Sequence, residues 1–241
     1  MIVLKDGFEF FGDAKGEADV FIYEPNNQKK CYEYIIRNKI KKIALCGEGE
    51  RTKDYYDSIK ELDWIEYLSH CNGAYDFSFV NNLGKLKTFI GNLKFTLDNP
   101  SVQIFSGDYF SKGKISKNCT GLKEIHIWKL PDFNSLFEEN FFPPQIKEIQ
   151  MIGYKSTDLN NSFSNSSLKK IEFARSRNLE SLKGIENFSA LETIILYSCK
   201  RIKDLSDINN LKNIQSIRIY NCPSIDFKTI ENLMDKVLIV K

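Results

Sequence analysis

The second half of the chain repeats one alternation of apolar and polar residues five times. Each copy has apolar residues at its first, fourth and sixth positions and mainly polar residues between them. The copies begin at Leu122, Ile146, Leu168, Leu191 and Ile214, so that successive starts lie 24, 22, 23 and 23 residues apart. Alternation over five to seven residues predicts a short β-strand with one buried face. A repeat of this length predicts a solenoid, in which each strand lies beside the strand of the next repeat.

The same spacing extends the pattern towards the N-terminus. Further strands are expected near Val20 and Ile22, from Ile40, Leu62 and Leu86, and at Val102 and Ile104. Only 13 residues separate Phe89 from Val102. Either a truncated repeat lies there, or residues 86–98 are an insertion and the true strand lies nearer Phe77 and Phe79. The segments between strands also carry apolar residues in register: Leu182, Ile185 and Phe188 are followed 23 residues later by Leu205, Ile208 and Leu211.

The segment Leu191-Glu-Thr-Ile-Ile-Leu-Tyr-Ser-Cys199-Lys-Arg-Ile202-Lys-Asp-Leu205 resembles the leucine-rich repeat family, in which Cys or Asn follows the strand. The resemblance implies an α/β solenoid with a curved parallel sheet on its concave face and irregular or short helical returns on its convex face. It also implies that Cys199, and Cys222 one repeat later, point inward and bond loop backbone. Ser176 occupies the same place in the preceding repeat, whereas Leu130 and Tyr154 do not suit it. The resemblance is closest between about 122 and 222 and concerns the fold, not an activity.

We expect one domain over residues 1–241, made of an N-terminal cap (1–38), repeats (39–222) and a C-terminal cap (223–241). Ile2 to Leu4 and Phe8 to Phe11 flank a Lys-Asp-Gly turn and predict a hairpin. The expected helix after Asn26 or Asn27 has an apolar face of Cys31, Tyr32, Ile35 and Ile36. At the other end, Phe227, Ile230 and Leu233 follow helical spacing, and Val237 to Val240 form a last strand.

The balance of charge disfavours two classes of partner. The chain has 34 basic and 32 acidic residues and a net charge of +2, which argues against binding to nucleic acid or to an anionic membrane. The N-terminus has too few apolar residues for a secretory signal, and no apolar run approaches a membrane span. The six cysteines form no close pairs, so we expect buried thiols in a cytoplasmic protein.

No catalytic or metal-binding motif in the sequence is complete. The two histidines, His70 and His126, lie on different repeats, and no cysteine or histidine spacing supplies a zinc site. Gly47-Glu-Gly49 follows a strand but lacks the remaining glycine or lysine of a phosphate loop, so it predicts a turn. We therefore expect no metal, no cofactor and no enzymatic activity.

The outward-facing positions of the predicted strands carry unusually many large side chains. The residues expected to contact a partner are Trp64, Leu68, Phe105, His126, Trp128, Ile152, Ile195, Tyr197, Arg218 and Tyr220. Exposed aromatic and arginine side chains supply much of the binding energy at protein interfaces. The alternative is that the aromatics stack on their neighbours along the sheet and stiffen it.

The pattern favours a non-enzymatic protein that is monomeric when unbound and binds another protein through its concave sheet. Within that class, small size and irregular repeats suit a bacterial inhibitor or immunity protein that neutralises a toxin. The alternatives are an adaptor or translocated effector that recruits a host protein, and a ligand-binding protein or enzyme that uses the concavity as a cleft.

Overall fold

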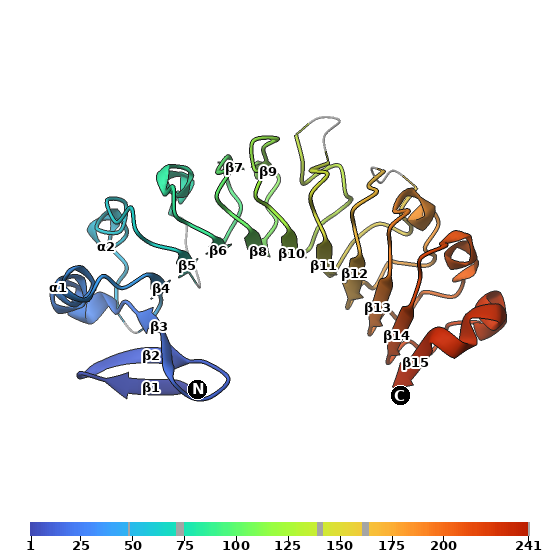
Figure 1. Cartoon of the computed structure of the whole chain (residues 1–241), viewed down its shortest axis with the longest axis horizontal. Coiled ribbons are helices and arrows are strands. Elements are labelled where there is room, and N and C mark those ends of the chain that lie inside the picture. The colour runs from blue at the N-terminus through green and yellow to red at the C-terminus, as the bar shows by residue number, and fades with distance from the viewer. Residues whose placement is uncertain (48, 71–74, 139–141, 161–163, 241) are drawn as a thin grey trace.

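The computed structural model describes residues 1–47, 49–70, 75–138, 142–160 and 164–240. Within these ranges, thirteen strands form one sheet that lines the inside of an arc, while the helices and loops lie on its outside (Figure 1). The strands follow each other in sequence order: β1 (Ile2–Lys5), β2 (Phe8–Gly12), β3 (Ala18–Ile22), β4 (Lys42–Leu45), β5 (Tyr67–His70), β6 (Thr88–Ile90), β8 (Ile104–Asp108), β10 (Glu124–Trp128), β11 (Glu148–Ile152), β12 (Lys170–Ala174), β13 (Thr193–Tyr197), β14 (Ser216–Tyr220) and β15 (Val237–Val240).

The returns contain short elements. They are the α-helices α1 (Gln28–Asn38) and α2 (Lys53–Asp57), the 3-10 helices η1 (Pro25–Asn27), η2 (Ser78–Asn82), η3 (Ile185–Asn187), η4 (Ser206–Asn210) and η5 (Phe227–Lys236), and the two-stranded sheet of β7 (Thr96–Leu97) and β9 (Lys114–Ile115). The expected apolar residues of the returns, from Leu182 to Leu211, are buried. Convex returns of this kind are what the repeat pattern predicts.

The register of the C-terminal half confirms the expected repeat. In adjacent parallel strands Ile125 is paired with Ile149, and the series continues through Ile171 and Ile194 to Ile217. All five side chains are buried. Because alternate residues point to opposite faces of a strand, this series fixes which side chains face the concave side.

The two ends of the sheet have the expected secondary structure. The hairpin of β1 and β2 turns at Asp6 and Gly7, whose φ angles are 54° and 80°. Helix α1 begins after Asn27 but buries Tyr34 together with Cys31 and Ile35, whereas the expected Ile36 is 37% exposed. At the C-terminal end β15 is a strand as expected, and η5 buries Ile230.

Both outermost strands expose apolar side chains. Ile2 and Leu4 of β1 are 57% and 73% exposed, and Leu238 and Ile239 of β15 are 52% and 40% exposed. Apolar side chains therefore remain in contact with solvent on both outermost strands.

The ambiguous region between residues 68 and 104 contains a truncated repeat, which is the first of the two alternatives. Strand β6 pairs directly with β8, placing Phe89 beside Phe105. Two glycines make this close approach feasible. A Cβ on Gly91 would lie 2.1 Å from Nε2 of His70, and a Cβ on Gly107 would lie 1.7 Å from the carbonyl oxygen of Gly91. His70 stacks on Phe77, with ring centroids 3.8 Å apart, in the space that larger side chains fill in later repeats.

The substitution Gly107→Ala is expected to destabilise the protein by about 1 to 3 kcal/mol or more, because the added methyl meets backbone that cannot move aside alone. Gly84→Ala is the matched control: a Cβ there meets nothing within 4 Å, so the change should be neutral or slightly stabilising. Urea unfolding of the two variants measures the difference. Equal stabilities would contradict the close packing of the short repeat.

Candidate functional site

The concave face between β10 and β14 carries a line of side chains at the last position of each strand. This strand-end row consists of Trp128, Ile152, Ala174, Tyr197 and Tyr220, which occupy equivalent positions in register. Trp128 is 39% exposed and Tyr197 is 44% exposed, whereas the alternate residues of the same strands fill the core. The row therefore presents large side chains that core packing does not require.

The arrangement of rings argues against a continuous stiffening ladder. Tyr197 and Tyr220 lie with ring centroids 6.2 Å apart and planes tilted by 43°. In the part of the chain that the structure describes, no aromatic ring packs against Trp128, because Ile152 and Ala174 separate it from the tyrosines. A stacking role is thus restricted to the tyrosine pair.

The shorter side chains leave a notch in the strand-end row. Trp128 and Tyr197 lie three strand steps apart, roughly 14 Å at the usual spacing of about 4.8 Å. Between them, Ile152 is partly exposed and Ala174 is 7% exposed. The notch is this stretch of the row, at Ile152 and Ala174, where the side chains are smaller than the aromatic residues on either side.

Several other expected residues also lie on this face. His126 and Arg218 occupy the row two positions before the strand-end row, on β10 and β14, and Arg218 is exposed. Ile195 belongs to the same inner row but is only 9% exposed, against expectation. Its neighbours in register are Glu172 and Arg218, whose longer side chains flank it.

The expected exposure of Leu68 and Phe105 is wrong. Both are fully buried and belong to the core series that continues to Ile125. In the structure the motif of the third repeat begins at Ile65, whereas the sequence analysis begins it at Leu62. A shift by three residues moves every side chain of the strand to the opposite face. The prediction for Phe105 is wrong for the same reason: Phe105 pairs with the buried Ile125, so its repeat is shifted from the expected register.

Trp64 is also misplaced, because it precedes β5 and is not part of the strand. Its indole Nε1 donates a hydrogen bond to the carbonyl oxygen of Ile40 at 2.9 Å. The ammonium of Lys39 lies 3.9 Å from the centroid of its ring. These contacts give Trp64 a structural role at the junction of α1 and β4.

Two glutamates near the concave face are ion-paired, and a third is hydrogen-bonded to a neutral amide. Hydrogen bonds from Lys87 and Lys41 lower the pKa of Glu66 to about 2. On β11, Glu148 lies 2.9 Å from the ammonium of Lys170. Glu172 accepts a hydrogen bond from the amide of Gln150, at 2.9 Å.

Two cations at the strand ends were not anticipated. Lys129 and Arg175 directly follow Trp128 and Ala174, are exposed, and form no ion pair within the described ranges. Their φ angles are 60° and 52°. The sequence signal that could have found them is their place: each comes immediately after the last residue of a predicted strand.

The residues after the strands point inward as the family resemblance implies. Ser176 Oγ accepts a hydrogen bond from the backbone N–H of Tyr154, and Cys222 Sγ accepts one from Cys199. The hydrogen bond with Cys222, together with burial, raises the pKa of the Cys199 thiol. Cys31, Cys119, Cys199 and Cys222 are free and buried, which confirms that expectation for them. Cys46 is also buried, whereas Cys71 lies outside the described residues.

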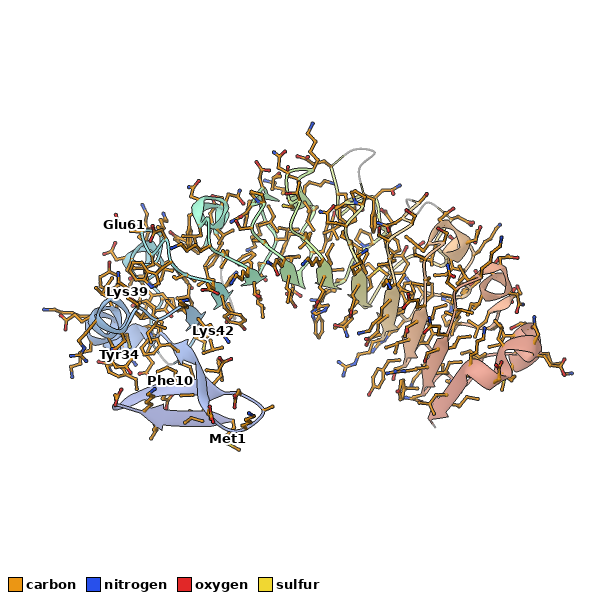
Figure 2. All side chains as sticks on the ribbon, in the orientation of Figure 1. Met1, Phe10, Tyr34, Lys39, Lys42 and Glu61 are labelled. Atoms are coloured by element: carbon orange, nitrogen blue, oxygen red, sulfur yellow. The ribbon has the colours of Figure 1, made fainter. Side chains whose placement is uncertain are left out.

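A second candidate is a hollow of about 440 Å³ at the N-terminal end of the arc. Tyr34, Lys39 and Lys42, which are labelled in Figure 2, line this hollow. Its charged groups already contact one another: Lys42 lies 2.6 Å from Asp19, and the Tyr34 hydroxyl donates to Asp6 at 2.8 Å. These groups satisfy each other, so the hollow is a weaker candidate than the concave face.

Within the described ranges, no three His, Cys, Asp or Glu side chains are grouped so that they would hold a metal ion. Nor does any helix in those ranges have the length and apolar character needed to cross a membrane. Gly47 and Gly49 have φ angles of 100° and 123°, as a turn requires, and Glu48 between them lies outside the described residues.

Comparisons with known proteins agree with this architecture. No family model matches the chain, and no curated protein matches it. Among solved structures, the chain is similar to an internalin from Listeria monocytogenes, with a TM-score of 0.54 and 17% sequence identity. The similarity covers 76% of this chain and 55% of the internalin, so the chain spans about half the length of that structure. Together with the parallel sheet and its repeating register, this likeness shows that the fold is a leucine-rich-repeat solenoid.

Proposed function

We propose that this chain is a non-enzymatic protein-binding solenoid whose working surface is the concave face between β10 and β14. The observation that carries the proposal is the exposure of Trp128 and Tyr197 in a single row of the sheet. Large apolar side chains gathered on a surface favour contact with a partner that removes them from water. Tryptophan and tyrosine are also the residues most enriched among those that dominate binding energy.

Within this class we propose a bacterial inhibitor or immunity protein that acts in the cytoplasm and neutralises a toxin. The chain would be a monomer before it binds, with residues 1–38 and 223–241 closing the repeats of 39–222 in a single domain. The proposal is supported by the simplicity of the mechanism that it requires. A protein with an extended binding surface can inhibit another protein by covering that protein's functional surface.

A photo-crosslinking experiment tests the binding surface. We expect p-benzoylphenylalanine at position 197 to crosslink one protein partner in cells, whereas the same residue at position 183 should not. Lys183 is a suitable control because it is exposed on a convex return between β12 and β13. Crosslinking from position 183 and not from 197 would reject the concave face. A crosslinked toxin would support the immunity role, and a crosslinked host protein would favour an adaptor or effector instead.

A further inference from the structure

The chemistry of the partner can be inferred from the unpaired charges around the strand-end row. Lys129 follows Trp128 directly and Arg175 follows Ala174, so their Cα atoms lie about 3.8 Å from those of Trp128 and Ala174. Arg218, two positions before Tyr220, is exposed, and its guanidinium contacts only Ser216 among described hydrogen-bond partners, at 3.4 Å. The notch therefore has three cations nearby whose charge no described ion pair neutralises.

Carboxylates also lie on the same face. Glu148 is paired with Lys170, whereas Glu172 accepts a hydrogen bond from the neutral amide of Gln150 and keeps its negative charge in the row two positions before the strand-end row. Glu124 lies at the opposite end of β10 from Lys129, and so is separated from the notch by the length of the strand. Among the residues that directly follow β10 to β14, Lys129 and Arg175 are therefore the charged ones, while the carboxylate of Asp108 lies beyond Trp128, in register with it on β8.

The backbone at these cations makes their side chains unexpected. The residue after each strand from β10 to β14 is left-handed: Lys129, Gly153, Arg175, Ser198 and Asn221 have φ between 50° and 67°. This conformation lets the N–H of Lys129 donate to Ile152 at 2.7 Å, and that of Arg175 donate to Tyr197 at 2.7 Å. Glycine and asparagine adopt it most readily, and they occupy two of the five places. Backbone preference does not explain the lysine and the arginine at two of the other three places.

We propose that the concave face recognises an acidic protein surface, in which an aliphatic or aromatic side chain enters the notch and neighbouring carboxylates pair with Arg175 and Lys129. This inference rests on the proposed protein-binding function and specifies its partner. Carboxylates suit arginine because the guanidinium forms paired hydrogen bonds with them.

A nucleic acid fits the face less well than a protein does. Binding of single strands relies on a path of several cations that follows the backbone, with aromatic rings beside it. Here Glu124 and Glu172, which form no ion pair within the described ranges, lie on the same face as the aromatic residues, where they would repel phosphates. An acidic protein surface can place its few carboxylates over the cations and avoid these glutamates.

Selection from a displayed library of random short peptides tests the proposal. The wild-type protein is expected to enrich peptides that combine Asp or Glu with a large apolar residue. The key variant is Lys129→Asn/Arg175→Asn, which removes both charges and suits the left-handed backbone, so it should fold at least as stably. It is expected to bind a selected peptide about 5- to 20-fold more weakly, and the wild-type affinity should fall with added salt. Trp128→Ala/Tyr197→Ala should abolish enrichment.

The possible outcomes separate the inference from the function on which it rests. Enrichment of apolar peptides without acids, or equal binding by the asparagine variant, overturns the acidic partner but leaves the concave face as a binding surface. No enrichment at all, or enrichment that survives loss of Trp128 and Tyr197, overturns both. Tight binding of a single-stranded oligonucleotide that the asparagine variant loses would replace the protein partner by a nucleic acid.

Discussion

Replacing Trp128 and Tyr197 together by alanine is expected to weaken binding of the protein partner by about 30- to 1000-fold while leaving thermal stability nearly unchanged. Both side chains are roughly two-fifths exposed, at 39% and 44%, so their loss creates no interior cavity. Truncation of central aromatic anchors typically costs about 2 to 4 kcal/mol of binding free energy, which corresponds to this factor. Calorimetric titration with the crosslinked partner, beside a thermal melt, measures both quantities.

Lys183→Ala on the convex side is the control for this double substitution and should alter neither binding nor stability. If the double variant melts early while its folded fraction binds normally, the aromatic residues are a structural ladder. If the partner is a toxin, the double variant should also fail to protect cells that express it. Full protection at normal expression would mean that another surface does the work.

Ile194→Ala is expected to destabilise the fold by about 2 to 5 kcal/mol. Ile194 is fully buried on β13, in register between Ile171 and Ile217. Its truncation leaves a cavity that a close-packed core fills only in part. Since each repeat is stabilised by its two neighbours, hydrogen exchange should also accelerate in β12 and β14.

Urea unfolding and native hydrogen exchange measure these effects. The exposed substitution Lys183→Ala should change the free energy of unfolding by less than about 0.5 kcal/mol. A loss of less than about 0.5 kcal/mol for Ile194→Ala would contradict its place in the core. A large loss confined to β13, with β12 and β14 unaffected, would contradict the coupling between repeats.

The sequence predicts the C-terminal repeats well because each strand has the same alternation and nearly the same spacing. Ile125, Ile149, Ile171, Ile194 and Ile217 are buried and in register as the pattern indicates. Strand geometry alone places alternate residues on opposite faces, so the exposed positions of Trp128, Tyr197 and Tyr220 follow directly.

The register fails in the third repeat because its apolar residues recur every third position. Leu62, Ile65 and Leu68 are all buried. A start at Leu62 places Tyr67 at the sixth position of the motif, whereas the true start at Ile65 places His70 there, so the sequence pattern favours the wrong start. The shift is odd in number, and it therefore exchanges the two faces of the strand and places Leu68 outside. Pairing of Leu68 with Ile43 and Phe89 removes the ambiguity.

The short repeat is hidden for a different reason. Gly91 and Gly107 stand where later repeats have a large apolar residue, which interrupts the motif around Phe89 and Phe105. The missing volume is supplied from another repeat, by the ring of His70, and by close approach of the backbones. A glycine in the sequence does not reveal which distant group fills its place.

By itself, the sequence determined the period, the strands, the core series of the C-terminal repeats and the concave position of the aromatic residues, since these depend on residues close together in the chain. Tertiary structure decided the exposure of each side chain and the pairing of each charge. Ile195 is covered although its position faces outward, and Glu148 is paired with Lys170 while Arg175 has no such partner within the described ranges. These properties depend on side chains one strand away, more than twenty residues distant in sequence, and become fixed only when the register of neighbouring strands is set.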